Sequence, residues 1–238
     1  MPELLSIIVP VFNEGATIGA VVDRLLTIPL PVAREVIVVN DGSRDRTRAA
    51  LDHIAQSGAT LSVVHLERNR GKGYAIREGF ARATGTIVAI QDADLELDPA
   101  QIADLVTPIL SGDGDVVYGS RFLDRSNAAP ASTLLANRAL TTLTNVLYRA
   151  SLTDMETCYK VMRTSVARSL TLRADRFDIE PEITAQLLRR GHRILERPVR
   201  FAPRSRAAGK KIGWSDGFAA IAMLCRQRVA RIDRRSRS

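Results

Sequence analysis

The chain has 238 residues, 45% of them hydrophobic, which suits one domain with a sizeable core. Its 34 Lys and Arg outnumber its 26 Asp and Glu, and its two isolated cysteines exclude a disulfide framework and a cysteine-based metal knuckle. It has no apolar run near the roughly 20 residues of a membrane span and no recognisable signal peptide, so we expect a cytoplasmic protein in a reducing compartment.

Strands and helices are predicted to alternate through the first half of the chain. Five short apolar runs predict buried strands at residues 4–12, 35–40, 61–66, 86–92 and 115–120. Four amphipathic stretches predict helices at residues 16–26, 45–56, 73–83 and 99–110. This alternation indicates an α/β fold, with a mostly parallel central sheet flanked by helices on both faces.

Polar residues follow four of the predicted strands at the point where each strand ends. The first strand runs into "PVFNEG", the second into "NDGSRDRT", the fourth into "QDADLE" and the fifth into "GSRF". In parallel sheets, ligands bind at the carboxyl ends of the strands. We therefore expect these four segments to meet at one rim and form the functional site.

The most unusual segment is an acidic strip at residues 92–98, directly after a predicted buried strand. It holds four carboxylates, Asp92, Asp94, Glu96 and Asp98, whose mutual repulsion would be unfavourable without a positive partner. Asp92 and Asp94 are two residues apart and could both reach one Mg²⁺ or Mn²⁺ ion. The alternative is an acidic loop that caps the helix beginning at Pro99, and Asp98 is assigned to that cap.

Two further loops suggest nucleotide binding. Turn chemistry explains most of "NDGSRDRT", but not the acid Asp41 directly after a buried strand, which could accept hydrogen bonds from a nucleobase. The glycine-rich, basic stretch at residues 69–79 opens a helix, where backbone N–H groups and Lys72 could hold a diphosphate. Its glycine spacing does not match a dinucleotide-binding fingerprint, which disfavours hydride transfer.

The second half is less regular. Helices are predicted at residues 132–150 and within "DIEPEITAQLLRRGH", ending near Gly191, while "LTDMETCYKVMR" is left unassigned. The run "RILERPVRFAP" is expected to be extended, and "SRAAGKKIGWSDG" to be a polar loop. Apolar residues between Trp214 and Val229 then recur at helical spacing.

Positive charge is concentrated at the end of the chain. Residues 1–195 contain 22 Lys and Arg and 23 Asp and Glu, a net charge of −1, whereas residues 196–238 contain 12 and 3, a net charge of +9. Such a segment favours an anionic partner, namely phosphate groups, a membrane surface or nucleic acid, although a solvated tail is the simpler alternative. Nucleic acid is the least favoured partner, because interleaved aromatic residues are lacking.

Six segments in this order resemble the family 2 glycosyltransferases of the GT-A fold. They are "SIIVPVFNEGATI", "EVIVVNDGSRDRT", "ERNRGKGYAIREGFARATG", "AIQDADLELDP", "DVVYGSRF" and "LTDMETCYKVMR". The resemblance is strongest to the branch that contains dolichol-phosphate mannosyltransferases and bacterial polyprenyl-phosphate sugar transferases. It implies a transferase domain at residues 1–217, followed by an amphipathic helix and basic tail at residues 218–238.

The resemblance also implies roles for individual residues. Those expected to bind the nucleotide sugar are Pro10, Phe12, Asn13, Glu14, Asp41, Lys72 and Ala93. Those expected to hold a divalent metal are Asp92, Asp94 and Glu96. The acceptor side would include Asn137, Arg138 and Asp154, with Arg121 contacting phosphate, and the catalytic group would be Asp92, Asp94, Arg121 and Asp154. A loop that resembles a phosphate-covering loop carries Arg204, Lys210 and Lys211.

The implied activity is metal-dependent, inverting transfer of a sugar from a UDP- or GDP-linked donor to a polyprenyl phosphate at the cytoplasmic face of a membrane. A lipid phosphate is already anionic near neutral pH and needs no strong base, whereas a hydroxyl acceptor would need one, for which Asp154 is the candidate. The alternatives are a transferase that uses a saccharide or protein hydroxyl, and a non-catalytic nucleotide-sugar binding subunit of a membrane complex. The sugar stays open, because "GKKIGW" stands where many mannosyltransferase relatives carry a Ser-Lys pair.

Overall fold

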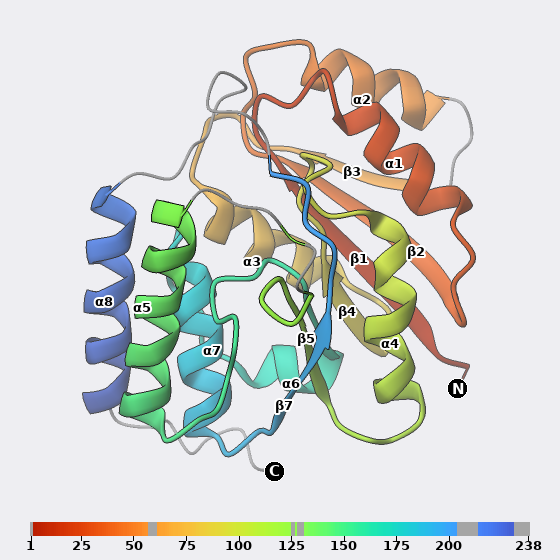
Figure 1. Ribbon diagram of the computed structural model, residues 1–238. Coiled ribbons are helices and arrows are strands. Elements are labelled where there is room, and N and C mark those ends of the chain that lie inside the picture. The colour runs from red at the N-terminus through yellow and green to blue at the C-terminus, as the bar shows by residue number, and fades with distance from the viewer. Residues whose placement is uncertain (1, 57–60, 125–126, 128–130, 204–213, 231–238) are drawn as a thin grey trace.

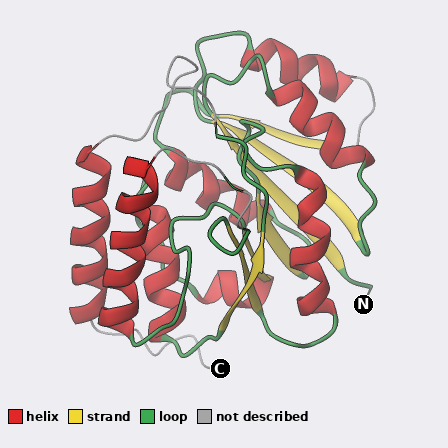
Figure 2. Cartoon of the chain, in the orientation of Figure 1, coloured by secondary structure: helices red, strands yellow, loops and turns green. Residues whose placement is uncertain are grey.

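The computed structural model describes residues 2–56, 61–124, 127, 131–203 and 214–230. Its described strands form one sheet of seven in the order β3-β2-β1-β4-β6-β5-β7, with helices on both faces (Figure 1 and Figure 2). The strands are β1 (Leu4–Val11), β2 (Ala33–Asn40), β3 (Leu61–His65), β4 (Ile87–Ile90), β5 (Val116–Ser120), β6 (Lys160–Arg163) and β7 (Ile194–Pro198). The helices are α1 (Ile18–Thr27), α2 (Thr47–Gln56), α3 (Lys72–Arg82), the 3₁₀ turn η1 (Pro99–Gln101), α4 (Ile102–Leu110), α5 (Ala131–Tyr148), α6 (Thr164–Ser169), α7 (Ile179–Arg189) and α8 (Trp214–Val229).

The five strands predicted from the apolar runs are confirmed. Strands β1 to β4 pair in parallel, and β7 pairs in parallel with β5. Strand β6, in the segment left unassigned from the sequence, lies antiparallel between β4 and β5. Because β6 leaves β4 and β5 pointing in the same direction, their carboxyl ends still face one rim.

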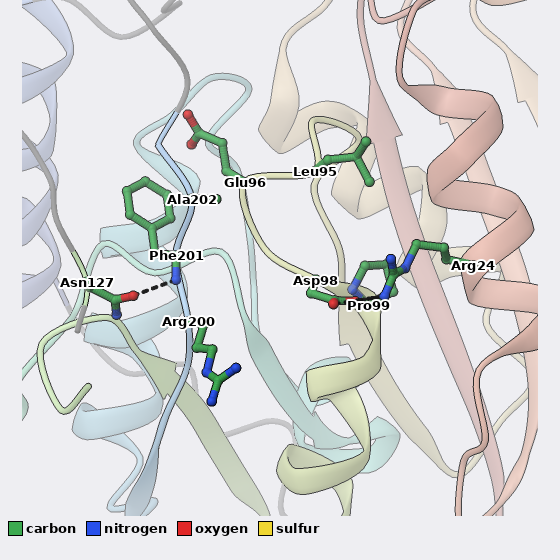
Figure 3. Close-up of a pocket in the computed structure, with 9 residues that line it drawn as sticks. All are labelled: Arg24, Leu95, Glu96, Asp98, Pro99, Asn127, Arg200, Phe201 and Ala202. Carbon is green, nitrogen blue, oxygen red and sulfur yellow. Dashed lines mark hydrogen bonds and ion pairs between the residues drawn. The ribbon is translucent and has the colours of Figure 1, made fainter. Parts of the chain in front are cut away.

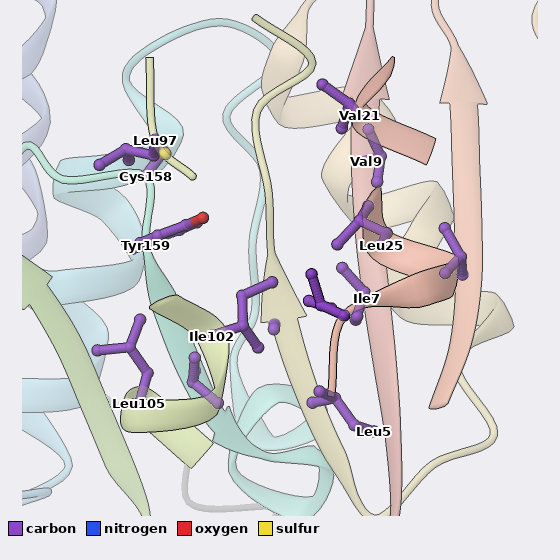
Figure 4. Packing of buried hydrophobic residues seen from close by; sticks show 14 of the residues in the cluster. Leu5, Ile7, Val9, Val21, Leu25, Leu97, Ile102, Leu105, Cys158 and Tyr159 are labelled. Atoms are coloured by element: carbon purple, nitrogen blue, oxygen red, sulfur yellow. The ribbon is translucent and has the colours of Figure 1, made fainter. Parts of the chain in front are cut away.

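Two hydrophobic layers enclose the sheet, as the period-two alternation of strand side chains requires. Leu5, Ile7 and Val9 of β1 face α1, α2 and α4 (Figure 4), whereas Ile8 between them faces α3, α6 and α7. Helix α3 packs closely on β1, since a Cβ atom added to Gly79 would lie 2.3 Å from the Ile8 side chain. This contact holds α3, whose first residue is Lys72, against β1.

The helix predictions hold with shifts of a few residues at most ends. The assignment of Asp98 to a helix cap is confirmed, because the Ala100 N–H donates to Asp98 Oδ1 at 3.0 Å at the start of η1. Helix α8 begins at Trp214, so the last four residues of the predicted polar loop at 205–217 are helical. Residues 204–213 of that region lie outside the described part of the chain.

Helix α8 packs beside α5 and α7 (Figure 1) and buries one of its two apolar sides. Ala220, Met223 and Leu224 face inward, whereas Phe218 and Ile221 are 71% and 41% exposed. The inward side thus anchors the helix to the fold, and the outward side remains accessible. Within the described residues, no helix is both long and apolar enough to span a bilayer.

Candidate active site

The loops that follow β1 and β2 are joined by hydrogen bonds between backbone and side-chain groups. Asn13 adopts a left-handed backbone conformation with φ of 54°, and its N–H donates to Ser43 Oγ at 2.9 Å. In return, the Arg44 N–H donates to Asn13 Oδ1 at 2.9 Å, and the Glu14 N–H donates to Thr47 Oγ1 at 2.9 Å. The two predicted nucleotide-binding segments therefore form one rigid wall of the site.

Asp41 is buried at the end of β2, where its carboxylate holds the glycine-rich loop. It accepts hydrogen bonds from Asn69 Nδ2 at 2.8 Å and from the backbone N–H groups of Arg70 and Gly71, both at 2.7 Å. Burial raises the pKa of Asp41, although these N–H donors oppose the increase. Asp41 thus orders the loop that leads into α3, and its contact with a nucleobase stays a prediction.

Four charges of alternating sign connect the acidic strip to the interior of the fold. The Lys72 ammonium lies 2.8 Å from Asp92 Oδ1 and 3.0 Å from Glu180 Oε1. Glu180, in the first turn of α7, also accepts a 2.5 Å hydrogen bond from the fully buried Lys160 of β6. Burial disfavours the Lys72 ammonium, but the carboxylates of Asp92 and Glu180 outweigh that effect and raise the pKa of Lys72. Lys72 therefore stays charged where a diphosphate is predicted.

The acidic strip offers oxygen ligands without forming a complete metal cage. No three His, Cys, Asp or Glu side chains of the described residues converge as a metal-binding group. Asp94 and Glu96 are half-buried on the strip, where the Glu96 N–H donates to Asp94 Oδ1 at 3.1 Å. Mg²⁺ is commonly bound by one or two carboxylates together with substrate phosphates, so this all-oxygen donor set fits such an ion when a diphosphate supplies the remaining ligands.

A buried amide and a buried phenol hold the acidic strip in shape. Gln91 Nε2 donates to the carbonyl oxygens of Asp92 and Leu97 at 3.0 and 3.2 Å, and so closes the loop at both ends. The Tyr159 hydroxyl lies 2.5 Å from Gln91 Oε1 and 2.8 Å from the carbonyl oxygen of Asp98. We call this arrangement of Gln91 and Tyr159 the strip clamp.

On the other side of the rim, Arg121 and Asp154 form a two-pronged ion pair. Arg121 Nε and Nη2 donate to the two carboxylate oxygens of Asp154 at 2.7 and 2.8 Å, and the Arg121 backbone N–H adds a 3.0 Å bond. Asp154 is fully buried and Arg121 is 16% exposed. Burial acts against the guanidinium charge, but Asp154 overcomes it and raises the pKa of Arg121.

The remaining predicted residues are distributed around this centre. Pro10 is buried in β1, and Phe12 and Glu14 are half-buried just beyond it. The carbonyl of the buried Ala93 accepts a 2.7 Å hydrogen bond from Thr17 Oγ1 at the start of α1.

The predicted acceptor residues Asn137 and Arg138 lie on α5. The Arg138 guanidinium lies 5.3 Å from the ring centre of Phe122, and Phe122 follows Arg121. The predictions for Arg204, Lys210 and Lys211 fall outside the described residues.

A cavity of about 500 Å³ borders the acidic strip on the side of α1 and η1 (Figure 3). The residues around it are Arg24, Leu95, Glu96, Asp98, Pro99, Asn127, Arg200, Phe201 and Ala202. Leu97 and Phe201 form an antiparallel bridge here, and the Ala202 N–H donates to the Glu96 carbonyl at 2.8 Å. The segment after β7 is thereby attached to the strip, whereas Asp92 and Arg121 do not line this cavity.

Lys160, Glu180, Gln91 and Tyr159 were not among the predicted site residues. Lys160 lies within the apolar run "CYKVM", and a lysine in a buried strand needs a charged partner, which is a signal that could have identified it. Glu180 carries no comparable signal, because it lies in the first turn of a helix that is far from the acidic strip in sequence. Only the sheet topology brings α7 to the rim.

Comparison with known families and curated proteins gives consistent matches. Residues 6–171 match the family model described as Glycosyl transferase family 2. The dodecaprenyl-phosphate galacturonate synthase of Rhizobium johnstonii is 35% identical over 120 residues, which cover 49% of this chain and 36% of that protein. The undecaprenyl-phosphate 4-deoxy-4-formamido-L-arabinose transferase of Pseudomonas aeruginosa is 35% identical over 130 residues, which cover 53% and 38%. The chain spans just over a third of the length of these two relatives.

Solved structures show the same fold. The glucosyl-3-phosphoglycerate synthase from Mycobacterium tuberculosis in complex with UDP superposes with a TM-score of 0.75 at 22% identity, covering 95% of this chain and 80% of that chain. The same synthase in complex with Mn²⁺, UDP and phosphoglyceric acid gives a TM-score of 0.74 at 22% identity, covering 96% and 80%. A likeness at this identity extends to the arrangement of the strands and helices.

Proposed function

The chain belongs to glycosyl transferase family 2 and has the GT-A type α/β fold, and from this we propose that it transfers a sugar from a UDP- or GDP-linked donor to a polyprenyl phosphate, with inversion at the anomeric carbon. Two curated relatives are named for transfer to dodecaprenyl or undecaprenyl phosphate, which supports this class of acceptor.

The donor side of the proposed site is the rim around Lys72 and the acidic strip. Lys72 presents a fixed ammonium to the leaving diphosphate, because Asp92 and Glu180 hold it from two sides. Asp92, Asp94 and Glu96 would hold a Mg²⁺ or Mn²⁺ ion, which when bound neutralises charge on the diphosphate. The fold neighbours crystallised with UDP and Mn²⁺ or Mg²⁺ are consistent with such an ion.

The observation that carries the acceptor assignment is the Arg121–Asp154 pair. Both carboxylate oxygens of Asp154 accept hydrogen bonds from the guanidinium, so this fully buried carboxylate is engaged in the ion pair and is not open to an incoming hydroxyl group. A guanidinium has five N–H donors, and among the described residues Asp154 accepts from two of them, so roughly three are left to bind a phosphate. An acceptor that is already anionic needs no base and suits this arrangement better than a neutral hydroxyl.

The proposal is tested by incubating the purified protein with UDP- and GDP-linked hexoses, Mn²⁺ and a short-chain polyprenyl phosphate. A glycosylated lipid phosphate is expected with at least one donor. Product formed only on a soluble hydroxyl acceptor, such as phosphoglyceric acid, would contradict the polyprenyl phosphate assignment and indicate a hydroxyl acceptor instead.

Substitution of two acids of the strip provides a matched test of the donor side. Asp94→Asn should lose nearly all transfer, because it removes a carboxylate assigned to the metal ion. Asp98→Asn should retain most of it, because Asp98 caps η1 and pairs with Arg24 at the surface. Turnover and thermal melting of both variants are the measurements, and wild-type turnover in Asp94→Asn would contradict the metal assignment.

A further inference from the structure

Glu156 is a half-buried acid that none of the roles above uses. Its Oε1 atom is inaccessible to solvent and has no hydrogen-bond partner among the described residues. A buried carboxyl oxygen without a donor typically costs about 1–3 kcal/mol, and more if the group is charged. Such an atom calls for an explanation, and a bound ligand that donates to it is one.

The turn that carries Glu156 is held rigidly by Lys160. The Lys160 ammonium donates to the carbonyl oxygens of Met155 and Thr157, which flank Glu156, and to Glu180 Oε2. An ammonium has three N–H donors, so Lys160 has none left for Glu156. The fold therefore fixes the backbone at Glu156 and leaves its oxygen unpaired despite the nearby cation.

Glu156 lies on the turn that is bonded to both the donor-side and the acceptor-side charges. Asp154, two residues before Glu156, pairs with Arg121, whereas Lys160, which holds the carbonyl groups on either side of Glu156, pairs with Glu180. Glu180 pairs with Lys72, which in turn pairs with Asp92 of the acidic strip. Arg121, which pairs with Asp154, is the proposed acceptor contact. A sugar that moves from a diphosphate at the first group to a phosphate at the second must lie between them.

We infer that Glu156 contacts the sugar of the donor and accepts a hydrogen bond from one of its hydroxyl groups. A carboxylate repels phosphate but is a strong acceptor for hydroxyl donors, so the chemistry fits the sugar rather than either phosphate. The inference rests on the proposed function, because it takes the positions of the two phosphates from it. By this contact, Glu156 would select among nucleotide sugars that differ in their hydroxyl groups.

The test compares binding of a nucleotide with binding of the corresponding nucleotide sugar, without any acceptor. At pH 8, UDP, GDP, UDP-glucose and GDP-mannose are titrated with Mn²⁺ into the wild-type protein and into Glu156→Gln by calorimetry. The variant should bind the bare nucleotides as the wild type does, and the better-bound nucleotide sugar about tenfold more weakly, as expected for a lost hydrogen bond to a charged group. Glu156→Asp, which keeps the charge but shortens the side chain, should show the same selective loss. It replaces Glu156→Gln in the titration if Glu156→Gln folds poorly.

Deoxy analogues of the bound sugar then identify the hydroxyl. The analogue that lacks it should bind equally to the wild type and to Glu156→Gln, while the other analogues keep the difference of about tenfold. Equal weakening of nucleotide and nucleotide sugar, no weakening of either, or the same ratio for every analogue would overturn the inference, as would failure of the wild type to bind a nucleotide sugar.

The binding test and the glycolipid test separate the role of Glu156 from the proposed acceptor. A selective loss of nucleotide-sugar affinity without glycolipid formation would retain the role of Glu156 and remove only the polyprenyl phosphate acceptor. Glycolipid formation without the selective loss would retain the proposed function and remove only the role of Glu156.

Discussion

The charged side chains at this rim differ in whether an oppositely charged partner compensates them. Lys160 has Glu180 as an ionic partner, and Asp154 has Arg121, whereas burial of Glu156 raises its pKa to about 7 with only weaker compensation from Lys160. A buried acid with a raised pKa is typical of a functional site, where stability is sacrificed for a group poised near neutral pH.

Folding stability should therefore depend on pH through Glu156. Its pKa is about 7 in the folded protein against 4.5 for an ordinary Glu, so the folded state binds the proton more tightly. Stability attributable to this group is greatest below pH 4.5 and falls as pH rises towards 7, by up to about 3 kcal/mol at about 1.36 kcal/mol per unit. Denaturant unfolding at pH 5 and pH 8 should show Glu156→Gln gaining stability relative to the wild type at the higher pH.

Glu78→Gln is the control for this measurement. The hydrogen bond from Arg82 lowers the pKa of Glu78, so Glu78 is already largely ionised at pH 5. The difference in unfolding free energy between this variant and the wild type should change little between pH 5 and pH 8. A pH-independent difference for Glu156→Gln as well would mean that Glu156 is not held in its neutral form by burial.

For individual residues, the sequence predicted which side chains lie at the strand ends but not which side chains they pair with. Asp92 and Lys72 were identifiable because each stands where an apolar strand ends or a glycine-rich loop opens a helix. That Lys72 pairs with Asp92 and Glu180 depends on the three-dimensional approach of α3, the strip and α7. No local pattern encodes that approach.

Among the elements, the acidic strip depends on contacts from Tyr159, the residue directly before β6. The Tyr159 hydroxyl donates to the Gln91 side chain, and Gln91 donates to carbonyl groups at both ends of the loop. The parallel strands were predictable from their apolar runs. The antiparallel β6 was not, because Lys160–Arg163 is short and carries charges at both ends.

Tyr159→Phe should weaken binding of the nucleoside diphosphate together with Mn²⁺. Loss of the hydroxyl leaves Gln91 Oε1 without its donor, so the loop that carries Asp92 and Asp94 is less well ordered. We expect affinity for UDP or GDP, measured by calorimetry with Mn²⁺, to fall by about three- to tenfold, the range for one net hydrogen bond.

The matched control is Tyr118→Phe on β5. It also removes a buried tyrosine hydroxyl, which lies 3.0 Å from Thr184 Oγ1 and does not contact the strip. Both variants should lose stability by a similar amount, but only Tyr159→Phe should lose nucleotide affinity. Equal losses of affinity would assign the effect to general destabilisation rather than to the strip clamp.

For the whole molecule, charge and exposed apolar surface coincide in the last part of the chain. Residues 196–238 have a net charge of +9, while the rest of the chain is nearly neutral. On α8, Phe218 and Val229 are 71% and 82% exposed, and Arg226 and Arg228 lie in its last turn. A helix with an outward apolar side and adjacent arginines suits the surface of an anionic membrane, where a polyprenyl phosphate would be found.

We therefore expect the protein to sediment with vesicles of phosphatidylcholine and phosphatidylglycerol at low salt, and to be released at high salt. Each basic residue near an anionic leaflet is worth about 1 kcal/mol, so Arg228→Glu, which removes one positive charge and adds one negative charge, should weaken binding by about tenfold or more. Arg48→Glu on α2 makes the same change on an exposed helix and should leave vesicle binding nearly unchanged. Binding that ignores lipid charge and salt, or that both substitutions weaken equally, would show that the end of the chain is not the membrane contact.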